Sequence, residues 1–144
     1  KIVCANAGDS RAILSRKGLV VPLSRDHKPY DASERKRIER AGSRVEDNRV
    51  DGRLAVSRAI GDFDFKRARN TAPEDQPVSP APEVLEEDRT PDDEYIVIAC
   101  DGLWDILENE SVLEFISTRL DCMTLREIAQ ELVEYAVEIG SMDN

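Results

Sequence analysis

The chain has 144 residues, of which 40% are apolar and 35% charged, an ordinary composition for a soluble globular protein. Its formal net charge of −10 would repel nucleic-acid phosphates, so we expect no nucleic-acid partner. No apolar run approaches the roughly 20 residues of a membrane span, so none is expected. Because a strand-like run already begins at Lys1 and the sequence stops soon after Gly140, we expect a fragment of a larger domain.

Three apolar, β-branched runs predict strands at the start of the chain: 2–5, 11–15 and 19–23. The turns between them contain Gly8 and Gly18, and an antiparallel meander is the simplest arrangement. Further on, Asp31 and Glu34 have the spacing of a capping box, which would begin a charged helix that runs to Ala41. The apolar face of this helix is thin, so we expect a surface subdomain.

The second half of the chain alternates between extended and helical patterns. Five prolines within 70–91 exclude a long helix and indicate an extended surface connection. A buried strand is expected at 95–100, followed by a helix from Asn109, as its N-cap, to about residue 120. A second helix would begin at a Thr124–Glu127 capping box. It has one apolar stripe, for which the sheet is the simplest partner: Leu125, Ile128, Ala129, Leu132, Val133, Ala136 and Val137.

The three cysteines are Cys4, Cys100 and Cys122. Their number is odd, and two lie in apolar strand-like runs, a pattern typical of buried reduced thiols and not of a disulfide framework. We therefore expect a reducing compartment, the cytoplasm, with the nucleus as an additional location.

Four aspartates stand at the ends of predicted elements and are candidate metal ligands. Asp101 and Asp105 emerge where the buried strand should end, on either side of Gly102, which would permit a sharp turn. Asp9 lies in a turn between strands, and Asp143 follows the end of a helix. A single aspartate in a turn usually caps the backbone, but four in such positions, two of them paired, favour a Mg²⁺ or Mn²⁺ site.

Other chemistries fit the sequence less well. Ser10 follows a Gly-Asp pair as in some serine esterases, but the only histidine, His27, lies in a loop close behind it and not near the C-terminus. The 62–64 block resembles aspartyl-phosphate phosphatases, but Lys66 stands where they have Thr or Val. A cysteine-based phosphatase is disfavoured because no cysteine is followed by an arginine six positions later.

Five blocks, in this order, resemble the metal-dependent serine/threonine protein phosphatases of the protein phosphatase 2C family: 6–11, 26–29, 54–62, 99–105 and 140–144. The resemblance implies an α+β fold, a four-layered α/β/β/α sandwich of antiparallel sheets flanked by antiparallel helices. Residues 1–144 would form the second part of a single catalytic domain, without its N-terminal part and its final strand. Residues 27–51 would be the flap subdomain, which is thought to influence substrate choice.

The resemblance also implies hydrolysis of phosphoserine and phosphothreonine on protein substrates by a water that two Mg²⁺ or Mn²⁺ ions activate, with a third ion in many members. Asp101 and Asp143 match the ligands of the second ion. Asp9, together with Asp101 and Asp105, resembles the looser third site. The block with Ser57 and Arg58 is interpreted as structural support.

Departures from the family pattern limit this expectation. The family's general acid and phosphate-binding residues lie in its first half, which has no counterpart here, so no catalytic residue is expected within this sequence. His27 is not the family's catalytic histidine, and the 144 residues alone should be catalytically incomplete. Two alternatives remain: a pseudophosphatase or regulatory binding module of the same fold, and a fragment that associates with itself through open sheet edges. The retained aspartates argue against the first, because carboxylates clustered at an empty site repel each other.

Overall fold

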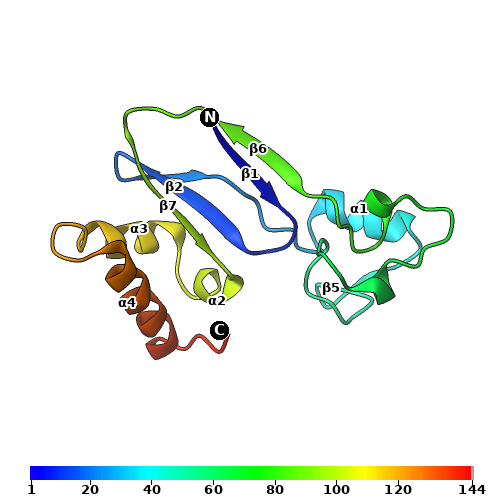
Figure 1. Ribbon diagram of the computed structural model, residues 1–144. Helices are drawn as coiled ribbons and strands as arrows, with labels where there is room; N and C mark the ends of the chain where they lie inside the picture. The colour runs from blue at the N-terminus through cyan, green and yellow to red at the C-terminus, as the bar shows by residue number, and fades with distance from the viewer. Residues whose placement is uncertain (144) are drawn as a thin grey trace. The chain divides into compact units, whose positions relative to one another are not determined.

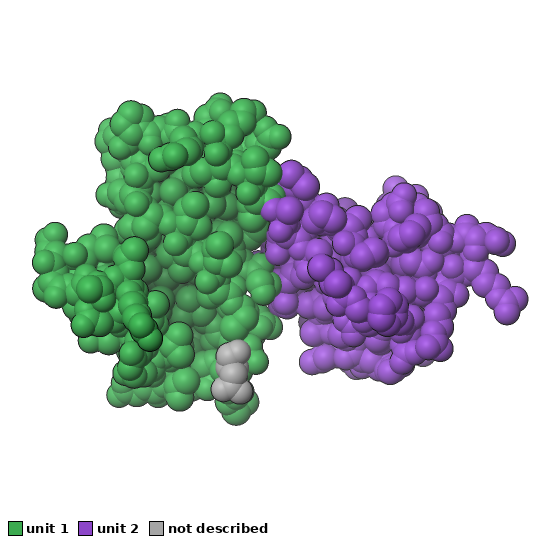
Figure 2. Space-filling model, viewed as in Figure 1, with its two compact units in different colours: residues 1–4, 10–24, 86–144 green, residues 5–9, 25–85 purple. Residues whose placement is uncertain are grey.

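The structure, a computed structural model, describes residues 1–143. It contains two compact units, coloured separately in Figure 2. Unit 1 comprises residues 1–4, 10–24 and 86–144, and unit 2 comprises residues 5–9 and 25–85. The span expected to form the flap, 27–51, lies within unit 2. Helices combine with antiparallel sheets, which confirms the predicted α+β class.

The sheet of unit 1 has the strand order β3-β2-β7 (Figure 1). Strand β2 (Arg11–Arg16) is central, and it pairs antiparallel with β3 (Leu19–Pro22) on one side and β7 (Asp93–Ala99) on the other. The predicted hairpin of the second and third strands is therefore confirmed. The meander was wrong in its first step, because β1 (Ile2–Asn6) pairs with β6 (Glu83–Glu87). Both edges of β2 are already occupied by β3 and β7, so β1 finds another partner.

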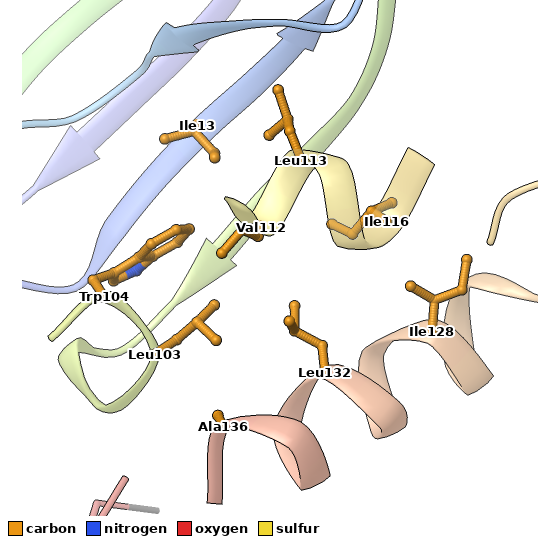
Figure 3. Packing of buried hydrophobic residues seen from close by; sticks show 9 residues of the cluster. All are labelled: Ile13, Leu103, Trp104, Val112, Leu113, Ile116, Ile128, Leu132 and Ala136. Atoms are coloured by element: carbon orange, nitrogen blue, oxygen red, sulfur yellow. The ribbon is translucent and has the colours of Figure 1, made fainter. Parts of the chain in front are cut away.

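Three helices follow β7 in unit 1: α2 (Asp101–Trp104), α3 (Asn109–Ser117) and α4 (Leu125–Glu138). Helix α3 packs against β3, α2 packs against β7, and α4 packs against both α2 and α3. Together they bury a core that includes one residue of β2, as Figure 3 shows: Ile13, Leu103, Trp104, Val112, Leu113, Ile116, Ile128, Leu132 and Ala136.

The helix ends and the stripe of α4 agree with the sequence only in part. The Thr124–Glu127 capping box is present as predicted. Asn109 is the first residue of α3 and not its N-cap, which is Glu108; the Asn109 side chain instead accepts a hydrogen bond from Arg11. The predicted apolar stripe of α4 is too broad, because it packs against α2 and α3 through only three buried residues and leaves Leu125, Val133 and Val137 exposed.

Unit 2 has a small core of its own. Helix α1 (Ala32–Arg40) contributes Ile38, and the rest comes from strand β5, a short 3₁₀ turn and a loop: Val50, Phe65 and Val78. Strands β4 (Val45–Glu46) and β5 (Arg49–Val50) form a hairpin whose two connecting residues have positive φ. The predicted capping box at α1 was wrong. The Asp31 side chain makes no cap hydrogen bond, and the Glu34 carboxylate instead forms buried ion pairs with Arg37 and Arg58.

The proline-rich segment forms more structure than the sequence indicated. Short 3₁₀ turns, η1 (Phe63–Phe65) and η2 (Pro73–Asp75), stand in place of a helix, as its prolines require. However, Val78 and Ser79 are fully buried and β6 begins at Glu83, so the prediction of a surface connection up to Tyr95 was wrong. Packing against Ile38 and Phe65 explains the burial of Val78.

All three cysteines are free thiols, but Cys100 and Cys122 are exposed and Cys4 is partly buried, so the expectation of buried thiols was wrong. Alternation along β1 explains the partly buried Cys4, since every second residue of this strand is exposed, whereas Cys100 follows the end of β7 as the N-cap of α2. Within residues 1–143, no helix is long and apolar enough to cross a bilayer.

Candidate metal centre

A group of three potential metal ligands lies at the end of strand β7 in unit 1. One ligand atom each from Cys100, Asp101 and Asp143 lies within 4.8 Å of the others. Strand β7 ends at Ala99, and Asp101 is the first residue of α2, so the carboxylate emerges at the junction of strand and helix. Asp143 arrives from the segment that follows α4. The predicted pair of Asp101 and Asp143 is therefore brought together by the tertiary structure.

Gly102 makes this approach possible. A Cβ atom at Gly102 would lie 2.9 Å from the Asp143 Cβ and 3.1 Å from its Oδ2, closer than such atoms normally approach. The Ser141 hydroxyl donates a 2.7 Å hydrogen bond to the Gly102 carbonyl, which ties the segment after α4 to α2. The sequence indicated Gly102 as a turn residue, whereas it lies inside helix α2, and close approach explains the glycine.

Trp104 anchors helix α2 to the strand that precedes it. Its Nε1 donates a 2.9 Å hydrogen bond to the Ala99 carbonyl, and its ring is almost fully buried in the core. The Arg11 guanidinium lies 5.2 Å from the Trp104 ring centroid, a cation–π distance. Because Ala99 and Trp104 flank Asp101 in sequence, their contact restricts where the Asp101 carboxylate can lie.

Asp105 and Asp9 occupy different surroundings from this group. Asp105 is the C-cap of α2 and is exposed, and it is not a member of the group formed by Cys100, Asp101 and Asp143. Asp9 belongs to unit 2. There its Oδ2 lies 2.5 Å from the Lys28 Nζ, and both side chains are largely buried. Asn144, the last residue of the motif that contains Asp143, lies outside the described residues.

The Gly8 and Asp9 turn in unit 2 is held by the loop that contains His27. The His27 amide donates to the Gly8 carbonyl at 3.0 Å, and the Asn6 side chain donates to the same oxygen at 3.1 Å. His27 is fully buried, and burial, together with the charge of Arg58, lowers the pKa of its imidazole. A buried, neutral His27 is a structural residue, which fits the interpretation made from its sequence context.

A buried carboxylate, Glu34, links helix α1 to the segment with Ser57 and Arg58. Its oxygens accept hydrogen bonds from Arg37 at 2.6 Å, from the Ser57 hydroxyl at 2.6 Å and from Arg58 at 2.7 Å. Burial by itself raises the pKa of Glu34, but the hydrogen bonds from Arg58, Ser57 and Arg37 outweigh it and lower this pKa to about 2. Sequence reasoning missed this role, although the Glu34 and Arg37 spacing, i and i+3, was a readable signal.

The chemistry of the donors decides which of them fit a hard cation. Carboxylate oxygens are the ligands that Mg²⁺ and Mn²⁺ prefer, whereas a thiol suits softer ions. Mg²⁺ is commonly held by one or two carboxylates while it keeps several waters. Asp101 and Asp143 meet this requirement, and Cys100 is not needed for it.

Known proteins with the same sequence pattern are phosphatases. The family model "Protein phosphatase 2C" matches residues 1–144. The chain is 46% identical over 140 residues to protein phosphatase 1B of Rattus norvegicus, covering 96% of this chain and 36% of that protein. It is 47% identical over 138 residues to protein phosphatase 2C homolog 3 of Schizosaccharomyces pombe, covering 95% and 33%. The chain therefore spans about a third of the length of these curated relatives.

Solved structures agree with the family match. A phosphatase from Toxoplasma gondii superposes with a TM-score of 0.84 at 35% identity, over 98% of this chain and 45% of that one. A sex-determining protein of C. elegans gives a TM-score of 0.86 at 26% identity, over 99% and 34%.

Proposed function

This chain belongs to the protein phosphatase 2C family, and on that premise we propose that its natural polypeptide is a metal-dependent protein serine/threonine phosphatase. The observation that carries the proposal is the approach of Asp101 and Asp143 to each other across Gly102. One or two carboxylates brought together in this way are the protein ligands by which Mg²⁺ is commonly held. The 144 residues would supply this pair to a larger catalytic domain.

Asp101 and Asp143 would hold a Mg²⁺ or Mn²⁺ ion. A bound divalent ion of this kind lowers the pKa of a coordinated water and neutralises charge on phosphoryl oxygens. The residues around the pair contribute preorganisation: Trp104 fixes the start of α2, and Ser141 fixes the segment before Asp143. We propose two or three ions in the complete site, with Asp9 and Asp105 as ligands of the third, loosely held one.

The substrates in this proposal are proteins phosphorylated on serine or threonine. Residues 27–51 would act as the flap that influences substrate choice. They include helix α1, which has a charged exposed surface and is attached through Ile38 and Glu34 to the core of unit 2. For location we propose the cytoplasm or nucleus, with the three free thiols as the supporting observation.

A pseudophosphatase of the same fold is the alternative from another functional class. It predicts that the Asp101 and Asp143 pair binds no divalent ion with useful affinity.

Self-association of the chain is a separate proposal: β7 pairs on one side only among the described strands and exposes Ile96 and Ile98. Sedimentation that shows a strict monomer at high concentration would contradict self-association.

The decisive experiment substitutes Asn for Asp101 in the intact natural polypeptide. We expect Asp101→Asn to lower Mn²⁺ affinity and phosphate release from a phosphothreonine peptide by more than about 100-fold, because even residues that only orient a metal ligand are worth 10–100-fold. Calorimetry measures the Mn²⁺ binding, and an assay with chelator measures the phosphate release that does not depend on metal. The exposed Asp121→Asn is the matched control and should change neither. Near-normal turnover of Asp101→Asn at limiting Mn²⁺ would refute the assignment.

A further inference from the structure

Asp9 already has a cationic partner in unit 2. The Lys28 Nζ lies 2.5 Å from the Asp9 Oδ2, and the two side chains are only 21% and 15% exposed. Several other ion pairs in the described residues are far more exposed, for example Lys17 with Asp92 and Arg40 with Asp75. Water and salt screen a largely buried pair much less than an exposed one, so the Lys28 ammonium interacts with Asp9 more strongly than it would at the surface.

The backbone on both sides of this pair is fixed. The amide of Gly8 lies 3.3 Å from the His27 Nδ1, and the carbonyl of Gly8 accepts from the His27 amide at 3.0 Å. Gly8 has a φ of +136°, a conformation that favours glycine, so another residue at this position would strain the turn. His27 and Lys28 are neighbours, as are Gly8 and Asp9, so the contact between His27 and Gly8 holds Lys28 opposite Asp9.

His27 also makes contacts with residues outside the Gly8 and Asp9 turn. Its carbonyl accepts a 2.9 Å hydrogen bond from the Ser57 amide, and its Nε2 lies 3.3 Å from a Glu83 carboxylate oxygen. If Nε2 carries the proton and donates to Glu83, Nδ1 is free to accept from the Gly8 amide, and both ring nitrogens are satisfied. Both His27 and Ser57 are fully buried, so the segment that carries Lys28 cannot move away without breaking buried hydrogen bonds.

We propose that Lys28 is an internal cation that competes with the divalent ion for the Asp9 carboxylate and so sets the affinity of the third metal site. The inference rests on the proposed function, in which Asp9 is a ligand of that ion. A divalent cation bound to Asp9 lies within a few ångströms of the ammonium, and repulsion between a +1 and a +2 charge at such a distance weakens binding by about tenfold or more. The third ion then binds only when its concentration is high.

The experiment measures Mn²⁺ binding to the intact natural polypeptide by electron paramagnetic resonance, which counts bound ions without reference to activity. Lys28→Met removes the charge and keeps the length of the side chain, and it should raise the affinity of the weakest ion by about tenfold or more. Lys28→Arg keeps the charge and should leave that affinity within about threefold. Lys17→Met, at an exposed ion pair in unit 1, is the matched control and should change nothing.

Asp9→Asn tests the premise separately. It should remove the weakest ion, and the double variant Asp9→Asn/Lys28→Met should behave like Asp9→Asn alone, because Lys28 then has nothing to compete for. Suppose that Asp9→Asn removes the weakest ion but Lys28→Met leaves its affinity the same or lowers it. Asp9 would then be a ligand of this ion, and the proposed competition by Lys28 would be wrong. If Asp9→Asn changes no binding, the inference is wrong, while Asp101→Asn still decides the phosphatase proposal.

A measurement on the unsubstituted protein guards against variants that fold poorly. The Lys28 Cε resonance, assigned by its loss in Lys28→Arg, should shift during a Mg²⁺ titration with the same midpoint as the weakest ion, because that ion separates the ammonium from Asp9. A resonance that does not move while the weakest ion binds would contradict the proposal.

Discussion

The two units of this chain are held together by different interactions. Unit 1 buries nine apolar residues in one cluster that joins β2 to three helices. Unit 2 buries only four apolar residues in its cluster, but among the described residues it contains nearly all the buried polar ones: His27, Glu34, Ser57, Gln76 and Ser79. Burial of apolar area is non-directional, whereas hydrogen bonds and ion pairs require particular partners at particular distances.

Unit 2 therefore depends on every partner being present. In residues 1–143 no buried side-chain nitrogen or oxygen lacks a hydrogen-bond partner. A satisfied network of this kind specifies one arrangement, but the loss of one member leaves the others buried and unpaired. The comparison predicts that substitutions in unit 2 lower stability by leaving buried polar groups unpaired, and that the stability of this unit depends on pH. Substitutions in unit 1 should lower stability by removing buried apolar volume.

The largest effect is expected from Glu34→Gln. The substitution keeps the size of the side chain but leaves Arg37 and Arg58 without their buried carboxylate, and breaking a buried ion pair from one side costs about 3–5 kcal/mol. Hydrogen exchange should show the loss at amides of unit 2, such as Ile38 and Val50, and much less at Ile13 in unit 1. Glu39→Gln, at an exposed pair on the same helix, is the control and should cost less than about 0.5 kcal/mol. Equal losses in both units would break the comparison.

A somewhat smaller effect, confined to unit 1, is expected from Leu132→Ala. Leu132 is buried between α4 and its neighbours, and truncation of a buried leucine costs about 2–5 kcal/mol. Val133→Ala on the same helix removes an exposed side chain and should cost little. Urea unfolding followed by Trp104 fluorescence measures both. A Val133→Ala loss as large as that of Leu132→Ala would show that the exposed side of α4 is packed against something in solution.

The smallest effect is a pH dependence that should appear in unit 2 alone. His27 is the only histidine of the sequence, and its pKa is lowered by burial and by Arg58, against the opposing charges of Glu34 and Glu83. A lowered folded-state pKa stabilises the protein above the unfolded pKa of about 6.5 and loses that contribution as the pH falls. Between pH 7 and pH 5, hydrogen exchange at Gly8 and Ser57 should therefore accelerate, corrected for intrinsic rates, while Ile13 stays protected.

His27→Asn is the control for this experiment, because asparagine does not titrate. Its stability will be lower at every pH, but the dependence between pH 7 and pH 5 should disappear. A slope that persists in His27→Asn would assign the effect to another group. Glu34 extends the sensitivity of unit 2 to stronger acid, since its contribution is present above about pH 4.5 and is lost as the pH falls towards its folded pKa of about 2.

Local patterns were reliable where local chemistry decides the outcome. Apolar runs predicted β2, β3 and β7, and the Thr124–Glu127 box predicted the start of α4 correctly because both of its hydrogen bonds lie within four residues. The same pattern at Asp31 and Glu34 predicted the helix but not the cap. There, two arginines and a serine offered Glu34 stronger, charge-assisted partners from elsewhere in the chain.

The sequence by itself determined the family, the α+β class and the four candidate aspartates, because these depend on residue types in a fixed order. Only the tertiary structure decided which of them meet. Asp101 and Asp143 come together since Gly102 has no side chain and Ser141 binds its carbonyl, whereas Asp9 pairs with Lys28. Such contacts join residues 19 to 42 positions apart, and spacing along the chain carries no information about distances of a few ångströms in space.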